Sequence, residues 1–373
     1  MSARRKPPFR ADHVGSLIRP EALAKAWKAA ERKEIGEAER KEIQRQAIRG
    51  IVELQQDLGF ELATDGEYNR EGWQRDFLLK IGNVTLVPSK IPTRFHTAEG
   101  DRDHKPPTMA VQGKLFRSSP IFVDDFAYLK SIARAEPKLT IPSPTILHFR
   151  GGRDAIDRTA YPDMEEFYAD LARVYTEEIA DLGAAGLRYL QVDDTNFAYL
   201  CDPDLRAHAR SIGENPDVLP HTYARLINAA IAARGADMTI CMHVCRGNYG
   251  GAWVASGGYE PVAETIFNEI NVDAYFLEYD SDRAGGFEPL RFLPDNKIVV
   301  LGLVTSKSPK LENKDELRRR IDEAAKFVPL ERLCLSPQCG FASGVEGAAM
   351  TFDQQVAKLR LVVETAREVW GSA

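Results

Sequence analysis

The 373-residue sequence has no uninterrupted apolar run of the roughly 20 residues that a membrane-spanning helix needs, and its first residues lack the apolar segment of a signal peptide. It has no run of more than three basic residues, the length of the opening Arg4-Arg5-Lys6, and 49 Lys and Arg against 55 Asp and Glu give a formal net charge of -6. This charge balance argues against nucleic acid as a partner. We therefore expect a cytoplasmic protein that binds neither membrane nor nucleic acid.

The sequence also lacks internal repeats, linker-like stretches and paired Cys-x-x-Cys motifs. Its five cysteines are an odd number in a long chain, which argues against a disulfide framework and for reduced thiols that could bind a metal. With 44% hydrophobic and 28% charged residues, the composition is that of an ordinary globular protein with enough apolar material for a large core. We expect one domain, residues 1–373.

The most informative stretch is an apolar run, residues 239–248, that ends in His243-x-Cys245 and a glycine turn. In an extended strand, side chains two positions apart point the same way, so the imidazole and the thiol would lie side by side. These two groups suit a borderline-soft ion such as zinc. Glu278 and Cys339 strengthen the hypothesis because each follows a short apolar run. The competing interpretation is that these residues are ordinary core cysteines and a core histidine.

Apolar runs alternate with amphipathic segments along most of the chain, and counting them gives eight strands separated by helices. This alternation predicts an α/β fold that closes as a (β/α)8 TIM barrel. The expected strands include residues 9–16 and residues 140–147, the latter weakened by two prolines. Residues of about 82–131 interrupt the rhythm, and we expect an inserted hairpin between strands 2 and 3 that serves either as a lid or as a plain decoration.

Catalytic groups of such barrels gather at the carboxyl ends of the strands. Three further residues fall at such ends, namely Ser16, Glu67 and Asp193. Asp193 and Asp194 face opposite ways in a strand, so we expect Asp193 to contact substrate and Asp194 to support the structure. Glu67 could instead cap a helix that begins near Glu71. Arg246 could be an anion clamp for a substrate or part of a surface salt bridge. Cys201, Cys241 and Cys334 are expected in the core.

From residue 9 to residue 370 the chain resembles the cobalamin-independent methionine synthase family, specifically its catalytic carboxyl-terminal barrel. The motifs that carry the resemblance are residues 242–245 (Met-His-Val-Cys), residues 191–194 (Gln-Val-Asp-Asp) and residues 336–340 (Ser-Pro-Gln-Cys-Gly). The family's duplicated amino-terminal half has no counterpart here, so the chain is similar to the short, single-barrel members.

The resemblance implies that zinc is held by four residues and that homocysteine lies against the turn at residues 14–16, with its ammonium held by Glu67 and Asp193. The implied zinc ligands are His243, Cys245, Glu278 and Cys339. Two thiolates and one carboxylate around a divalent ion leave a net charge of about -1, which suits the delivery of a nucleophilic sulfur to a carbon. No catalytic residue beyond the thiol that zinc activates is predicted.

The sequence departs from the family's pattern at two places, both at positions expected to act on the methyl donor. The family's tryptophan that stacks on the pterin is replaced within residues 148–150 (His-Phe-Arg), and its histidine expected to protonate the leaving folate is replaced within residues 303–306 (Leu-Val-Thr-Ser). The sequence therefore predicts a zinc-dependent thiol S-methyltransferase, with homocysteine as acceptor and a methyl-tetrahydrofolate-type donor. The alternatives are another thiol or electrophile, as in epoxyalkane:coenzyme M transferase, methylcobalamin as donor, or a sealed structural zinc site in a binding protein.

Overall fold

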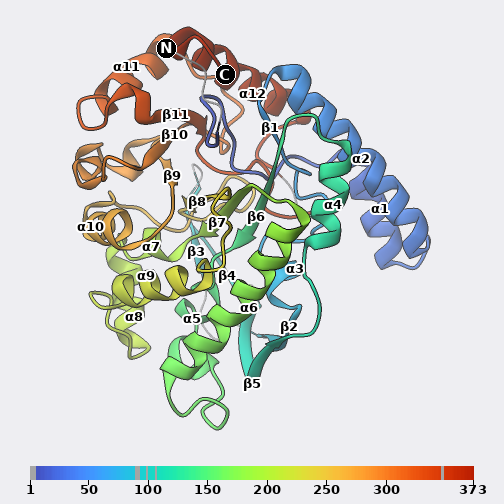
Figure 1. Ribbon diagram of the computed structural model, residues 1–373, viewed down its shortest axis with the longest axis vertical. Helices are drawn as coiled ribbons and strands as arrows, with labels where there is room; N and C mark the ends of the chain where they lie inside the picture. The colour runs from blue at the N-terminus through green and yellow to red at the C-terminus, as the bar shows by residue number, and fades with distance from the viewer. Residues whose placement is uncertain (1–5, 89–92, 98–99, 106, 346–347) are drawn as a thin grey trace.

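A parallel sheet of seven strands forms the centre of the computed structural model, which describes residues 6–88, 93–97, 100–105, 107–345 and 348–373 (Figure 1). Arg4 and Arg5 of the opening basic run lie outside these residues. The strand order is β1-β6-β7-β8-β9-β10-β11. The strands are β1 (Leu62–Ala63), β6 (Glu136–Pro142), β7 (Tyr189–Asp194), β8 (Thr239–Val244), β9 (Ala274–Glu278), β10 (Ile298–Val304) and β11 (Leu333–Pro337).

Helices cover the outer face of this curled sheet, as Figure 1 shows. The longer ones are α1 (Glu21–Glu31), α2 (Glu37–Leu58), α4 (Val123–Ile132), α6 (Met164–Ala185), α8 (Pro203–Ser211), α9 (Leu219–Ala230), α10 (Glu260–Glu269), α11 (Lys314–Ala324) and α12 (Phe352–Trp370). The short ones are α3 (Arg75–Leu78), α5 (Ile146–Phe149), α7 (Asn196–Tyr199), η1 (Gly152–Ala155), η2 (Asp282–Ala284), η3 (Glu288–Phe292) and η4 (Leu330–Arg332). None of the helices in the described part of the chain combines the length and the apolar character required to cross a membrane.

Local sequence signals explain where these helices begin and end. The Asp163 side chain accepts a hydrogen bond from the backbone N–H of Glu165 and so caps the start of α6, which ends at Gly186 in the left-handed conformation. The strands are buried on both faces, as continuous apolar runs predict for a parallel sheet covered by helices. The α/β organisation expected from the alternating pattern is therefore confirmed.

Two expected strands are wrong in part. Residues 140–147 do not form one strand, because β6 ends at Pro142 and residues 146–149 form α5. Pro144 has no N–H to continue a ladder. Of residues 9–16, only Ala11 forms a bridge, parallel to Leu335 of β11. Two hydrogen bonds support it, from Asp12 N to Leu335 O and from Leu335 N to Arg10 O, at 3.0 and 2.9 Å.

The segment between β1 and β6 contains two antiparallel strand pairs followed by α4. Strand β2 (Ile81–Val87) pairs with β5 (Thr108–Arg117), and β3 (Thr93–Phe95) pairs with β4 (Arg102–His104). The Arg117 side chain anchors β5 to α6 through Glu178 and Asp181, at 2.8 and 2.6 Å. The hairpin expected in residues 82–131 is thus two nested strand pairs, and the last residues of that range belong to α4. Residues 89–92, 98–99 and 106 lie outside the described residues.

Candidate metal centre and substrate pocket

Four buried side chains from three strand ends converge on one point. His243 lies near the end of β8 and Cys245 just beyond it, Glu278 ends β9, and Cys339 follows β11 by two residues. Each offers one ligand atom, and these atoms all lie within 4.8 Å of one another. The side chains that the sequence singled out as metal ligands are therefore brought together, although β9 and β10 separate β8 from β11 in the sheet.

Gly302 of β10 allows these strand ends to approach. It pairs with Glu278 in the parallel ladder, and a Cβ atom at this position would lie 2.7 Å from the Cα of Gln338 and 2.8 Å from the carbonyl oxygen of Leu277. Any larger residue would push the Cys339 loop away from β9. The sequence carried this signal as a lone glycine inside an apolar strand, which often marks a close backbone approach.

The imidazole of His243 is oriented for a ligand. Its Nδ1 lies 3.2 Å from the carbonyl oxygen of Phe276 and donates to it, while its buried Nε2 has no hydrogen-bond partner among the described residues. A backbone carbonyl on one ring nitrogen, with the other left as an acceptor, is the usual arrangement of a metal-binding histidine. A buried polar atom without a partner is costly, so this nitrogen indicates that a further group belongs at the site.

The two thiols form a close pair. Cys245 Sγ lies 3.4 Å from Cys339 Sγ, and the N–H of Gly247 donates to Cys245 Sγ at 3.3 Å. A hydrogen bond from Cys245 favours the thiolate of Cys339 and lowers the pKa of Cys339 well below its ordinary value, while the same hydrogen bond raises the pKa of Cys245. The pair therefore gives up a first proton readily, as metal-binding thiols must.

Glu278 is held as a carboxylate by its neighbours. Its Oε1 accepts from the backbone N–H of Arg246 at 2.9 Å, and its Oε2 lies 3.4 Å from the guanidinium of Arg283. Burial by itself would raise the pKa of Glu278, but the positive charges of Lys307 and Arg283, with that of Arg246, outweigh it and lower the pKa. The carboxylate thus remains available as a ligand.

Arg246 is buried, so its interpretation as part of a surface salt bridge is wrong. Its Nη1 donates to the hydroxyl of Tyr259 at 2.7 Å and to the carbonyl oxygen of Glu278 at 3.2 Å, and its Nη2 donates to Gly257 O at 2.7 Å. The Tyr259 hydroxyl also lies 2.9 Å from the N–H of Glu278, which donates to it. Tyr259, which sequence reasoning missed, and Arg246 therefore fix the end of β9.

The expected substrate residues lie around the turn that follows the Ala11 bridge. Ser16 is buried against Gly340, where a Cβ atom would come within 1.9 Å of the Ser16 hydroxyl oxygen. Glu67 is buried, its Oε1 accepts from the Thr140 hydroxyl at 2.7 Å, and its Oε2 has no hydrogen-bond partner among the described residues. No helix begins at Glu71, which removes the capping interpretation of Glu67.

Asp193 and Asp194 have different surroundings. Asp194 accepts from the Thr145 hydroxyl at 2.5 Å and from the N–H groups of Asn196 and Phe197 at 2.7 and 2.9 Å, so it holds the chain that follows β7. Asp193 pairs across the ladder with His243 and accepts from the Gln191 amide at 2.6 Å. Burial, together with the nearby charge of Glu67, raises the pKa of Asp193 to about 7.

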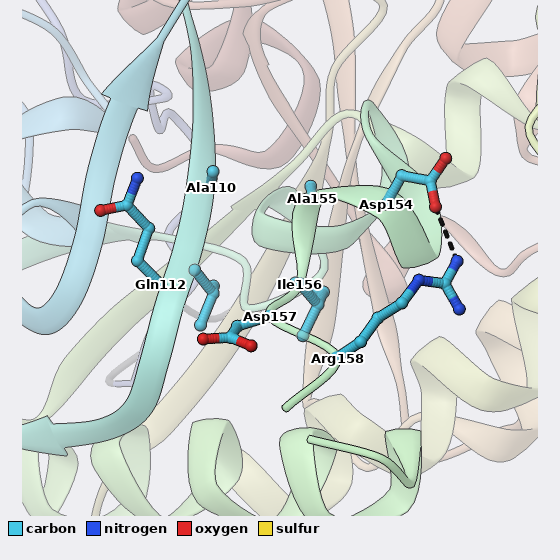
Figure 2. A pocket seen from close by; sticks show the side chains of 8 residues that line it. Ala110, Gln112, Asp154, Ala155, Ile156, Asp157 and Arg158 are labelled. Atoms are coloured by element: carbon cyan, nitrogen blue, oxygen red, sulfur yellow. Dashed lines mark hydrogen bonds and ion pairs between the residues drawn. The ribbon is translucent and has the colours of Figure 1, made fainter. Parts of the chain in front are cut away.

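The donor-side residues are divided between the core and a cavity. His148 is buried, with Nδ1 at 2.9 Å from the Tyr223 hydroxyl. Phe149 and Arg150 instead line a cavity of about 310 Å³. None of the four ligands lines another depression, where residues 154–158 run beside β5 and Asp154 pairs with Arg158 on the surface (Figure 2). It has no feature of a catalytic site.

Comparison with known proteins gives a consistent set of relatives. Residues 9–368 match the family described as "Cobalamin-independent synthase, Catalytic domain". The "Uncharacterized protein YxjH" of Bacillus subtilis is 46% identical over 372 residues, which cover 98% of this chain and 96% of that protein. The "Methionine synthase" of Pyrococcus furiosus is 24% identical over 330 residues, covering 88% and 84%. A crystal structure from Listeria monocytogenes, described as that of the "Putative Vitamin-B12 Independent Methionine Synthase", has a TM-score of 0.77 and 35% identity, covering 99% of this chain and 100% of that chain.

Proposed function

Because this chain belongs to the family of cobalamin-independent methionine synthase catalytic domains and is a methyltransferase, we propose that it is a zinc-dependent enzyme that methylates homocysteine to methionine. The donor in this proposal is a methyl-tetrahydrofolate-type compound. The observation that carries it is the convergence of His243, Cys245, Glu278 and Cys339 beside two buried carboxylates, Glu67 and Asp193.

The donor set fits zinc. Two thiols, an imidazole and a carboxylate are ligands that zinc accepts in tetrahedral sites, and the unpartnered Nε2 of His243 supplies the lone pair that such a site requires. Zinc bound there would act as a Lewis acid that keeps a substrate thiol deprotonated near neutral pH. The burial of all four ligands excludes bulk water, which strengthens the electrostatic interactions at the site.

Two carboxylates favour an acceptor that carries an ammonium group. Glu67 and Asp193 are close enough for the charge of Glu67 to act on the pKa of Asp193, and neither is neutralised by a short ion pair. Arg70 Nη1 lies 3.5 Å from Glu67 Oε1, but Glu67 Oε2 has no hydrogen-bond partner among the described residues. An ammonium group placed between the two carboxylates would relieve their repulsion, and homocysteine provides one.

A sulfonate-bearing thiol such as coenzyme M would need a free guanidinium instead. Arg246, the expected clamp for such a group, uses Nη1 and Nη2 for Tyr259, Glu278 and Gly257. We therefore assign Arg246 to positioning Glu278 and favour homocysteine over a sulfonate thiol. In the overall reaction, the acceptor sulfur forms a bond to the methyl carbon, the bond from this carbon to the donor nitrogen breaks, and that nitrogen takes up a proton.

We propose that the sheet closes as a single-domain (β/α)8 barrel, with the segment at Ala11 as the remaining strand between β11 and β1. The bridge to Leu335 supports one side of this closure. On the other side, the N–H of Leu17 donates to Gly66 O at 3.0 Å, just beyond β1. A cytoplasmic location is part of the proposal, because all five cysteines are free thiols.

A screen of thiol acceptors on zinc-loaded protein tests the function. Homocysteine, coenzyme M and a thiol without a charged group are each offered with 5-methyltetrahydrofolate, methylcobalamin or an epoxide. We expect methionine from homocysteine and 5-methyltetrahydrofolate. Turnover of coenzyme M with the epoxide would contradict the acceptor assignment, and the absence of any turnover with intact zinc would favour a sealed structural site.

A further inference from the structure

The loop that follows β10, residues 305–313, carries a lysine across the mouth of the candidate metal centre. Strand β10 lies between β9, which ends at Glu278, and β11, which leads to Cys339. From this loop, Lys307 donates from Nζ to the carbonyl oxygen of Gly247 at 3.1 Å. Gly247 follows β8, on the other side of β9. The lysine side chain therefore passes the end of β9, where Glu278 lies.

Gly247 joins the lysine to the thiol side of the centre. Its φ of 86° is left-handed, and a Cβ atom there would lie 2.8 Å from Cγ2 of Val254, so only glycine suits the turn. In this conformation its N–H donates to Cys245 Sγ at 3.3 Å while its carbonyl oxygen accepts from Lys307 Nζ. A single residue thus contacts both a candidate ligand sulfur and the ammonium group.

The loop that carries Lys307 is anchored to its surroundings. The N–H of Ser306 donates to Oε1 of Gln338, the residue before the last candidate ligand, at 2.6 Å. Farther along the loop, the Glu312 carboxylate accepts from Lys358 Nζ of α12 at 2.9 and 3.0 Å. These contacts fix the backbone from which Lys307 extends, so little further ordering is needed when its ammonium binds an anion.

The charge of Lys307 acts on two of the four candidate ligands. Burial by itself would raise the pKa of Glu278, and Lys307 is foremost among the cations that lower it. A hydrogen bond with Cys339, together with burial, raises the pKa of Cys245, and the charge of Lys307 opposes that rise. The ammonium group therefore lies near the anionic part of the centre.

Lys307 differs from the two arginines near the same ligands. Arg246 donates to the Tyr259 hydroxyl at 2.7 Å, and Arg283 lies 2.6 Å from Asp280. Lys307 is partly buried, and its ammonium uses one of its three donors on a carbonyl oxygen. Within the described ranges of the chain, no carboxylate lies within ion-pair distance of this ammonium. It therefore retains donors for an anion that arrives at the ligands.

We propose that Lys307 binds the thiolate sulfur of the acceptor at the metal centre and balances its charge. This inference rests on the proposed function and deepens it, because it assigns a residue to the sulfur rather than to the ammonium group of the acceptor. Two cysteine thiolates and one carboxylate around zinc leave a charge of about -1, and the acceptor thiolate brings it to about -2. The ammonium of Lys307 returns the charge to about -1. It thereby favours the thiolate over the thiol that predominates in neutral solution, and the thiol proton passes to the solvent as the sulfur binds.

Calorimetric titration of zinc-loaded protein with homocysteine tests the inference without relying on turnover. Lys307→Met removes the charge and keeps most of the side-chain length. It should weaken homocysteine binding by about 10- to 100-fold, because a contact to a charged group is lost. Lys307→Arg keeps the charge and should recover part of the affinity. Lys310→Met is the matched control, since Lys310 is an exposed lysine of the same loop; it should bind homocysteine like the wild type.

Methionine and zinc distinguish a role on the sulfur charge from a purely structural role. Methionine has the ammonium and carboxylate groups of homocysteine but an uncharged sulfur, so it should bind the wild type and Lys307→Met equally. Zinc affinity, measured by competition with a chelator, should also be unchanged in Lys307→Met. If Lys307 only clamped the turn at Gly247, the variant would lose affinity for zinc and for methionine as well.

Equal affinities of the wild type and Lys307→Met for homocysteine, a loss that extends to methionine or to zinc, or no binding of homocysteine to the wild type would each overturn the inference. Failure of the proposed function has a different signature, namely homocysteine binding that depends on Lys307 but no methionine formed from homocysteine and 5-methyltetrahydrofolate.

Discussion

The sulfur atoms of Cys245 and Cys339 lie 3.4 Å apart, although 94 residues separate them in the sequence. This distance is well beyond the roughly 2.05 Å of a disulfide bond, and both cysteines are free. Two buried thiols at this separation share a proton or share a metal ion. With His243 and Glu278 beside them, the two thiols belong to a set of four side chains whose chemistry suits a shared metal ion.

Replacing Cys245 with alanine should remove zinc and activity together. Loss of a residue that only orients a metal ligand already costs about 10- to 100-fold in metal affinity, so loss of a ligand itself should cost more than about 100-fold. Zinc content after gel filtration and the rate of methionine formation measure both effects. Cys241→Ala is the control, because Cys241 is buried in β8 two residues before His243 and does not belong to the ligand set; it should retain zinc and lose about 1 kcal/mol of unfolding free energy. Full zinc retention in Cys245→Ala would refute the metal assignment.

Replacing Tyr259 with phenylalanine should weaken the site through Glu278. The hydroxyl accepts from Glu278 N and from Arg246 Nη1, so its loss leaves two buried donors with one contact fewer and should cost about 1–3 kcal/mol of unfolding free energy. Zinc affinity, measured by competition with a chelator, should fall about 10- to 100-fold.

The matched control for Tyr259→Phe is Tyr279→Phe. Tyr279 is also buried, its ring lies 5.5 Å from that of Tyr259, and its hydroxyl has no hydrogen-bond partner among the described residues. Its loss should change the unfolding free energy by less than about 0.5 kcal/mol and leave zinc affinity unchanged. Equal effects of the two substitutions would contradict the supporting role of Tyr259.

Replacing Glu67 with glutamine should weaken homocysteine binding specifically. Loss of an ion pair with the substrate ammonium should raise the Kd for homocysteine by about 10- to 100-fold, because hydrogen bonds to charged groups contribute about 1.5–3 kcal/mol. A thiol without an ammonium group should bind the variant and the wild type equally. Glu71→Gln, at an exposed neighbour that pairs with Arg75 at 4.0 Å, is the control. An unchanged Kd for homocysteine in Glu67→Gln would exclude Glu67 from the substrate site.

His13 should make the protein less stable in acid. Burial, and then the positive charge of Lys138, lower the pKa of His13 from 6.5 to about 3. His13 of the unfolded chain therefore binds a proton near pH 6.5, whereas His13 of the folded chain stays neutral until the pH approaches 3. This contribution to stability is present above pH 6.5 and is lost as the pH falls toward 3. Between pH 7 and pH 5 the loss should be about 2 kcal/mol.

Urea unfolding of the wild type and His13→Gln at pH 7 and pH 5 measures this contribution. The variant should lose about 2 kcal/mol less between the two pH values than the wild type, whatever its stability at pH 7. Identical losses in the two proteins would show that His13 does not titrate as described.

The local pattern of apolar and polar residues was sufficient to predict much of the fold. Helix α12 (Phe352–Trp370) begins at a capping box formed by Thr351 and Gln354 and ends at Gly371 in the left-handed conformation, so local residues set both of its ends. Apolar runs likewise located the central strands. The strand expected at residues 140–147 was too long because apolar content does not show where a proline ends a ladder, and the first strand was reduced to one bridge because its length depends on its neighbours.

For the site, the sequence by itself determined the chemical types of the candidate ligands and their positions at strand ends, since two-residue alternation and strand boundaries are local properties. Only the tertiary structure decided what each group contacts. It brings the thiols of Cys245 and Cys339 to 3.4 Å from strands that are not neighbours, and it directs Arg246 to hydrogen bonds with Tyr259 and Glu278. It also joins the insertion to the loop at Trp253 through backbone hydrogen bonds with His96. These relationships follow from the curl of the sheet, which brings the ends of β8 and β11 together across space. No local pattern encodes a distance between residues so far apart in the chain.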